Sequence, residues 1–223
     1  MTQTIIHVGL HKTGTTWIQR ELFDTQQKYQ VVYEPVDYTM LHDGRPLLIS
    51  YEGLSGCPYY WQYPKGVNVR EQIARNLHHM FPDARILLGT RNIDSWVKSL
   101  YSQAVKSGEV CLYDEFQHRL HTINKQFLDI DKYITVLCEL FEEVHLYKFE
   151  MLQENPNEFV SDICRFLDIP IPSSLDFKPR NKKLTPHQLQ MYRQLNRLCH
   201  SPVHPGIIPH TFLKRMVKEL RNE

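Results

Sequence analysis

The sequence predicts an α/β fold, in which a central parallel β-sheet of about five strands is flanked by helices on both faces. Two features predict it. Short apolar runs rich in β-branched residues alternate along the chain with longer segments of helical periodicity. The length of 223 residues fits one domain with a sizeable core, so residues 1–223 are expected to form a single domain.

The first strand and the turn after it contain the strongest functional signal. Residues 4–8 form an apolar run, a polar turn follows, and a helix-compatible segment begins near Gly14. A helix N-terminus offers unpaired N–H groups and a partial positive charge, and glycine lets the backbone approach a ligand closely. Lys12 adds a full positive charge, and the hydroxyls of Thr15 and Thr16 add donors. The stretch therefore predicts a cradle for a phosphate-like anion.

The loop departs from the common nucleotide-binding pattern G-x-x-x-x-G-K-[ST], because Lys12 precedes the second glycine. Residues 12–17, with the letters KTGTTW, resemble instead the 5′-phosphosulfate-binding loop of the sulfotransferases, K-[ST]-G-T-[TS]-[WL]. The resemblance implies a P-loop NTPase-like sulfotransferase fold, with 3′-phosphoadenosine 5′-phosphosulfate (PAPS) as sulfuryl donor and no metal. The residues that it assigns to the 5′ end of the donor are Lys12, Thr13, Gly14, Thr15 and Thr16.

A helix is expected over residues 15–24, with Trp17, Ile18, Leu22 and Phe23 available to one apolar side. Trp17 has two interpretations that the sequence leaves open. It stands at the position where the family stacks the adenine, and it also suits the core of the helix.

Two further strands are expected at residues 31–33 and 47–50, the second of them buried. Residues 57–66 are rich in tyrosine, tryptophan and proline. They form either a surface loop or the wall of an acceptor pocket, because aromatic faces suit sugars and other rings. A helix is then expected over residues 68–80, with an apolar stripe of Val69, Ile73, Leu77 and Met80.

Residues 85–90 form the clearest strand after the first, and a helix over residues 94–107 follows, capped by Asp94 or Asn92. This unit resembles the element with which sulfotransferases bind the 3′-phosphate: a strand ending in arginine, with a serine eight positions later. Here the pair is Arg91 and Ser99. Arginine suits the role because it offers several planar donors to a phosphate.

Residues 114–140 are expected to be helical, and residues 144–149 form another strand. His118 and His121 lie three positions apart, but no further ligands stand at metal spacing, so we interpret them as ordinary helix residues. Residues 150–167 resemble a strand–turn–helix segment of the family, which implies a structural role for the helix.

A basic segment precedes the last predicted core helix, which begins near Thr185 and Pro186. Such a charge run is usually solvated, whereas the family resemblance implies that it closes over the 3′-phosphate. Its residues are Arg180, Asn181, Lys182 and Lys183. A final amphipathic helix is expected over residues 211–220.

Transfer to an acceptor hydroxyl or amine requires a general base. Glu52 is the first candidate because it follows a buried strand at the edge where ligands of open α/β sheets bind. His11, beside Lys12, is the second candidate, and Glu34 is the third. Lys12 itself would stabilise the leaving oxygen as charge develops there.

Composition and charge exclude some classes of partner and indicate where the protein is located. The net charge of +1 argues against a dedicated nucleic-acid binder. No apolar run approaches the roughly 18 residues of a membrane span, and the early first strand leaves no room for a signal peptide. The 5 scattered cysteines read as reduced thiols, so a cytoplasmic location is expected.

The expected acceptor is a small molecule or a carbohydrate. Two other functions stay open: a small-molecule kinase that uses ATP and Mg²⁺, which the position of Lys12 disfavours, and a non-catalytic nucleotide-binding module.

Overall fold

The computed structural model describes residues 4–33, 44–58, 69–123, 125–178 and 184–200, together with 208–209; at 199–200 and 208–209 only the backbone is described. Its centre is a parallel sheet of five strands in the order β2-β3-β1-β4-β5, which confirms the predicted fold class. The strands are β1 (Thr4–Gly9), β2 (Gln30–Val32), β3 (Leu47–Ser50), β4 (Arg85–Thr90) and β5 (Val144–Lys148).

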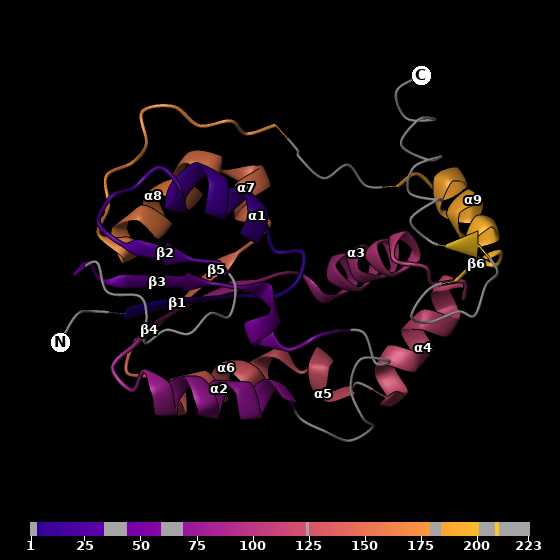
Figure 1. Cartoon of the computed structure of the whole chain (residues 1–223), viewed down its shortest axis with the longest axis horizontal. Helices are drawn as coiled ribbons and strands as arrows, with labels where there is room; N and C mark the ends of the chain where they lie inside the picture. Colours follow the sequence, from indigo (N-terminus) through magenta and orange to yellow (C-terminus); the bar gives the residue numbers. More distant parts are fainter. Residues whose placement is uncertain are drawn as a thin grey trace.

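Helices cover both faces of this sheet (Figure 1). One face carries α1 (Thr15–Ile18), the π-helical turn η1 (Gln19–Phe23), α7 (Met151–Glu154) and α8 (Pro156–Leu167). The other carries α2 (Val69–Met80), α3 (Ile93–Lys106), α5 (Lys125–Leu128) and α6 (Ile130–Leu140). The remaining elements are η3 (Glu52–Ser55), α4 (Tyr113–Ile123), α9 (Pro186–Asn196) and the short parallel pair β6 (Cys199–His200) and β7 (Ile208–Pro209).

Alternation along the strands divides the core into two apolar clusters. Ile6 and Val8 of β1 pack toward α2, α3 and α6, whereas Ile5 packs toward α1, η1 and α8. Successive side chains of a strand point to opposite faces, so His7 lies on the same face as Ile5. This places one fully buried polar residue inside an otherwise apolar strand.

One helix prediction needs correction. The predicted stripe of α2 is wrong at its end, because Met80 is 51% exposed while Arg70 is buried on the core side. The segment 114–140 is helical as expected over its described residues, and it consists of α4, α5 and α6, the last capped by Asp129. Of the two candidate caps for the helix after β4, Asn92 is confirmed: its side chain accepts the Ser95 N–H, and the helix begins at Ile93.

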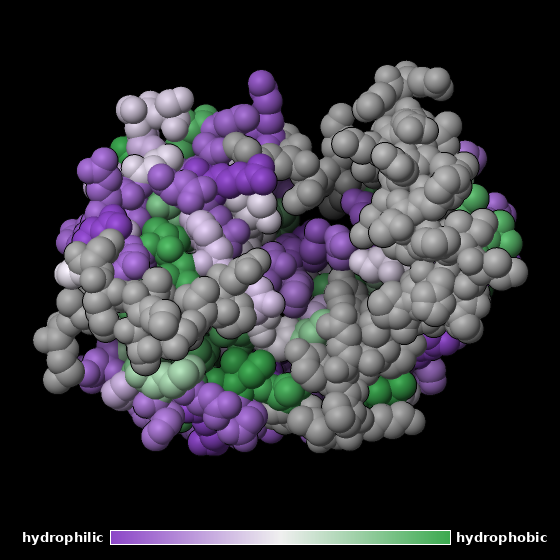
Figure 2. Space-filling model, in the orientation of Figure 1, coloured by the Kyte–Doolittle hydropathy of each residue, from purple (hydrophilic) through white to green (hydrophobic). Residues whose placement is uncertain are grey.

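The sheet order brings two chain connections together at its carboxyl edge. β1 and β4 are neighbours, with Gly9 opposite Gly89. The helix after β1 packs into one of the two apolar clusters, and the helix after β4 packs into the other. Ligands of open α/β sheets bind at such a point. Figure 2 shows hydrophilic side chains gathered in the middle of this view, over the edge where the strands end.

Among the described residues, no helix combines the length and the apolar composition that a membrane crossing requires.

Candidate functional site

The loop after β1 is held in an unusual backbone conformation. Lys12 has φ +69° and Gly14 has φ +86°, both in the left-handed region. Glycine adopts this region at little cost, whereas for lysine it is uncommon and must be maintained by the surroundings. Gly14 is also the N-cap of α1 and provides no side-chain cap for the first N–H groups of the helix. The loop thus offers backbone donors beside the Lys12 side chain.

Three side chains fix the loop by its carbonyl oxygens. The Thr13 hydroxyl donates to the carbonyl three residues earlier, which closes the turn from within. A tryptophan and an arginine from the β4–α3 unit donate to the next two carbonyls. The bonds are Thr13 Oγ1 to Leu10 O (2.6 Å), Trp96 Nε1 to His11 O (2.6 Å) and Arg91 Nη1 to Lys12 O (2.8 Å).

Lys12 and Arg91 form a local positive centre. Burial lowers the pKa of the Lys12 ammonium; Glu52 acts to raise that pKa, and Arg91 acts to lower it. Burial also lowers the pKa of Arg91, opposed by Glu150. Two half-buried cations at neighbouring strand ends favour a bound anion, because the anion relieves their mutual repulsion.

Arg91 makes a hydrogen bond to a serine of the helix that follows it. Its Nε donates to Ser95 Oγ at 3.0 Å, one helical turn before Ser99. The guanidinium also lies 4.5 Å from the centroid of the Phe149 ring. Ser99 is half-buried on α3, the helix that carries Ser95. Arg91 therefore has one nitrogen on the loop carbonyl and one on Ser95, and Ser95 is a site neighbour that the sequence did not identify.

Glu52 and His11, the first two candidates for the base, lie together. Glu52 opens η3 directly after β3, and its Oε2 lies 3.2 Å from His11 Nδ1. The other ring nitrogen, His11 Nε2, lies 3.2 Å from the Gly56 carbonyl oxygen. Both ring nitrogens thus face oxygen atoms, and the His11 ring is held between Glu52 and the Gly56 carbonyl. The structure therefore brings the two candidates together beside the loop.

Trp17 is buried, 8% exposed, in the apolar cluster beneath α8. Its indole N–H donates to the carbonyl of Asp176 at 2.7 Å, and its ring stacks on Phe177 with centroids 5.4 Å apart. The N–H of Asp176 donates in turn to Glu21 Oε2 at 3.0 Å. Asp176 is thereby fixed to α1 and η1, a few positions before residues 180–183 in the sequence.

Several predicted site residues lie outside the described residues. They are Glu34, Arg180, Asn181, Lys182 and Lys183, together with most of the aromatic segment 57–66 and the expected helix 211–220. Within the described part of the chain, no group of three or more His, Cys, Asp or Glu side chains is placed to hold a metal ion. The four cysteines with described side chains are free thiols.

The sequence matches the family described as sulfotransferase domain over residues 2–198. The chain belongs to this sulfotransferase family. Its fold is similar to a crystal structure of a sulfotransferase from Alicyclobacillus acidocaldarius, with a TM-score of 0.57 and 16% identity over 88% of this chain and 92% of that one. No curated protein matches the sequence significantly. The family resemblance of residues 12–17 is thus confirmed, and the structural similarity supports the fold.

Other residues that hold the loop or lie beside it gave no motif in the sequence. Ser95, Trp96 and Phe177 belong to no pattern that the sequence singles out. His7 alone carried a usable signal, since a histidine inside a β-branched strand must find buried hydrogen-bond partners. The identity of those partners could not be predicted, because the side chains that meet there come from β3 and β5.

Proposed function

We propose that this sulfotransferase moves the sulfuryl group of PAPS to a hydroxyl or amine of a small-molecule or carbohydrate acceptor in the cytoplasm. One observation carries the proposal. Arg91, at the end of β4, donates to the carbonyl of Lys12 in the β1 loop. This bond joins the loop of Lys12 to Arg91. The two cations are therefore held together, one for the 5′-phosphosulfate of the donor and one for its 3′-phosphate. Glu52 lies near enough to Lys12 to act to raise the pKa of the lysine.

The residues present fit the donor. The backbone of residues 13–16, the Thr16 hydroxyl and Lys12 would hold the 5′-phosphosulfate, and Arg91 with Ser99 would hold the 3′-phosphate. The Trp17–Phe177 stack would receive the adenine if the two rings separate, because aromatic stacking requires a free face. Residues 180–183 would add positive charge over the 3′-phosphate.

PAPS supplies the sulfuryl group and a leaving 3′,5′-bisphosphate. A new bond forms from sulfur to the acceptor oxygen or nitrogen, and the bond from sulfur to the bridging oxygen breaks. Lys12 stabilises the negative charge that develops on that bridging oxygen. Glu52 takes the proton from the acceptor, and His11 holds the carboxylate through its Nδ1–H.

Binding separates this function from its alternatives. Isothermal titration calorimetry would compare adenosine 3′,5′-bisphosphate, adenosine 5′-phosphate and ATP·Mg²⁺ with the full chain. We expect the bisphosphate to bind at least ~10-fold more tightly than the monophosphate, since the extra phosphate meets a charged partner. Preferential binding of ATP·Mg²⁺ would favour a kinase and contradict the proposal.

Turnover separates an enzyme from a binding module. The chain would be incubated with ³⁵S-labelled PAPS and a panel of sugars, phenols and amines. The expected outcome is labelled product with at least one acceptor, abolished in Lys12→Ala. Tight bisphosphate binding with no transfer to any class of acceptor would favour the non-catalytic module.

A further inference from the structure

A chain of buried polar side chains runs beneath the loop, on the α1 and α8 face of the sheet. Its centre is His7 of β1, which is fully buried. His7 Nδ1 lies 2.7 Å from Ser50 Oγ of β3, and His7 Nε2 lies 2.9 Å from Tyr147 Oη of β5. Gln19, the first residue of η1, donates from Nε2 to Ser50 Oγ at 3.1 Å and to Ser50 O at 3.2 Å. Four elements therefore meet in one hydrogen-bonded chain.

The direction of the protons at one end follows from the amide of Gln19. The Ser50 carbonyl can only accept, so the Gln19 nitrogen, rather than its oxygen, faces Ser50. Ser50 Oγ thus receives a proton from Gln19, and its own proton is free to go to His7 Nδ1. A neutral His7 then carries its proton on Nε2 and donates it to Tyr147 Oη.

The contacts at the Tyr147 end of the chain favour the same direction of proton donation, from His7 toward the loop. The only proton of Thr13 Oγ1 goes to the Leu10 carbonyl, so the Thr13 hydroxyl presents lone pairs to its neighbours. Tyr147 Oη and Thr13 Oγ1 lie against the same point of β4, because a Cβ on Gly89 would stand 2.3 Å from the first and 2.7 Å from the second. Burial raises the pKa of the Tyr147 phenol. Thr13 and Thr15 act to lower that pKa, because their hydroxyls lie close enough to rotate and donate to a phenolate, whereas beside the neutral phenol they can accept its proton.

The space under the loop exists because two paired residues are glycine. A Cβ on Gly9 would lie 2.3 Å from Thr15 Oγ1, and Gly89 stands opposite Gly9 in the sheet. Thr15 Oγ1 is buried near the phenol but makes no hydrogen bond of ordinary geometry within the described part of the chain. The Tyr147 phenol lies beside both loop hydroxyls and has one proton to donate, so its orientation decides which of the two hydroxyls can accept that proton.

We propose that the chain Gln19–Ser50–His7–Tyr147 is a positioning relay that sets the conformation of the Lys12 loop through Thr13 and Thr15. This inference rests on the proposed function only in one respect, the identity of the ligand that the loop binds. His7 and Tyr147 act through Thr13, whose bond to Leu10 closes the turn that presents Lys12. Burial lowers the pKa of His7 to about 3, so the histidine stays neutral and the direction of the relay does not change near neutral pH.

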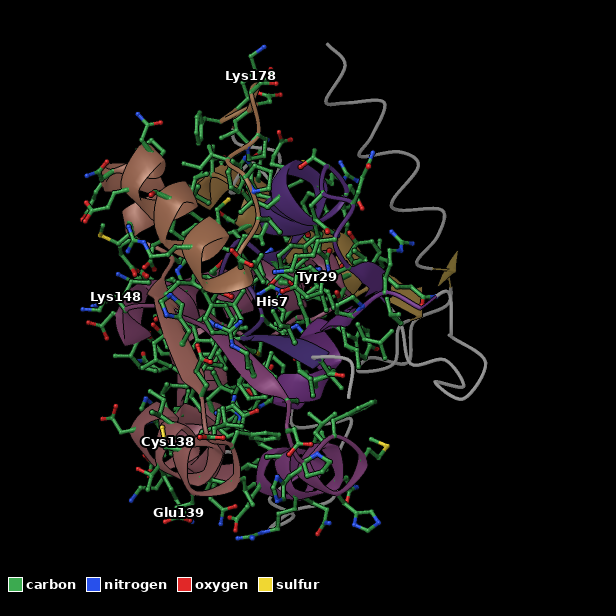
Figure 3. The ribbon with its side chains drawn as sticks, turned by 90° about the vertical axis from the view of Figure 1, so that its left-hand side faces the viewer. His7, Tyr29, Cys138, Glu139, Lys148 and Lys178 are labelled. Carbon is green, nitrogen blue, oxygen red and sulfur yellow. The ribbon has the colours of Figure 1, made fainter. Side chains whose placement is uncertain are left out.

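The test removes one hydroxyl, in Tyr147→Phe, and uses Tyr29→Phe as the matched control. Tyr29 is equally buried in the same apolar cluster, and its hydroxyl donates to Leu167 O at 2.7 Å, without a contact to the loop. Figure 3 labels His7 and Tyr29 in the interior, whereas Lys148 and Lys178 lie at the periphery. The two variants therefore share a loss of buried hydrogen bonding and differ in the partner lost.

The first measurement needs no ligand. Amide hydrogen exchange over residues 10–16 should accelerate by ~10-fold or more in Tyr147→Phe and stay within about two-fold of wild type in Tyr29→Phe, since one buried hydrogen bond corresponds to roughly one decade. Equal exchange of this segment in wild type and Tyr147→Phe would overturn the relay, whatever the ligand of the protein is.

The second measurement uses the proposed donor site. Tyr147→Phe should weaken adenosine 3′,5′-bisphosphate by ~10-fold and raise the KM for PAPS similarly, with the KM for the acceptor within about two-fold. His7→Gln, whose amide N–H can reach Tyr147, should retain more affinity than His7→Leu, which has no donor. Unchanged affinity in Tyr147→Phe, or equal losses in the two His7 variants, would refute the relay. Failure of wild type to bind the bisphosphate would refute the proposed function instead.

Discussion

Replacing His7 by glutamine is expected to flatten the acid side of the stability curve. His7 is fully buried, and burial alone lowers its pKa from 6.5 to about 3. The groups packed on it are the Ser50 hydroxyl, the Tyr147 phenol and the edge of the Phe23 ring, none of which changes charge between pH 5 and 7.5. The folded protein therefore keeps His7 neutral across this range.

The sign follows from proton binding. The unfolded chain takes up a proton at His7 below pH 6.5, and the folded chain does so only near pH 3, so stability falls as the pH falls between these values. Each pH unit corresponds to about 1.4 kcal/mol. Between pH 6.5 and 5 the loss is about 2 kcal/mol. For a chain of this size that corresponds to a decrease in Tm of roughly 4–8 °C.

The assay is urea denaturation of wild type, His7→Gln and Tyr29→Phe at pH 5.0 and 7.5. Glutamine does not titrate, so His7→Gln should lose about 2 kcal/mol less than wild type over this interval, even though it starts less stable. Tyr29→Phe should be destabilised equally at both values of pH. A wild-type protein and a His7→Gln variant with the same pH slope would refute the reasoning, since His7 would then titrate alike in the folded and unfolded states.

The remaining predictions concern the donor and the proton. Lys12→Ala should lower kcat by at least ~100-fold and affect the affinity for the bisphosphate less, because the lysine charge matters most when the leaving oxygen becomes negative. Near-normal turnover in this variant would show that Lys12 does not stabilise the leaving oxygen. Arg91→Ala should weaken the binding of adenosine 3′,5′-bisphosphate by roughly 2–5 kcal/mol, and the binding of adenosine 5′-phosphate much less. The control variant Arg85→Ala, at the far end of β4, should leave the affinity for both ligands unchanged. Equal losses of affinity for both ligands in Arg91→Ala would contradict 3′-phosphate recognition. Glu52→Gln should lower kcat by ~10²–10⁴-fold and abolish the acidic limb of the pH–rate profile. Normal turnover in Glu52→Gln would show that another residue is the general base.

Much of the strand framework could be predicted from local sequence alone. The strands at Leu47–Ser50 and Arg85–Thr90 begin and end where the apolar runs do, because a fully buried parallel strand reads as a continuous apolar segment. Helix faces were less predictable. On α2 the buried Arg70 donates to the carbonyls of Ser55 and Phe127, although this position was not part of the predicted apolar stripe. Long charged side chains can be buried when distant carbonyls satisfy them, and periodicity contains no information about such partners.

The sequence by itself determined the loop and its family, since residues 12–17 are contiguous and their chemistry is local. Only the tertiary structure decided how the loop is held. His7 and Tyr147 are 140 positions apart, Arg91 and Lys12 are 79 apart, and each pair meets because β1 lies beside β4 and β4 beside β5. The pairing of Glu52 with His11 likewise depends on the β1–β3 contact. A strand's apolar pattern specifies which face is buried, but the order of strands in the sheet depends on packing across the whole core, and that order selects which polar side chains become neighbours.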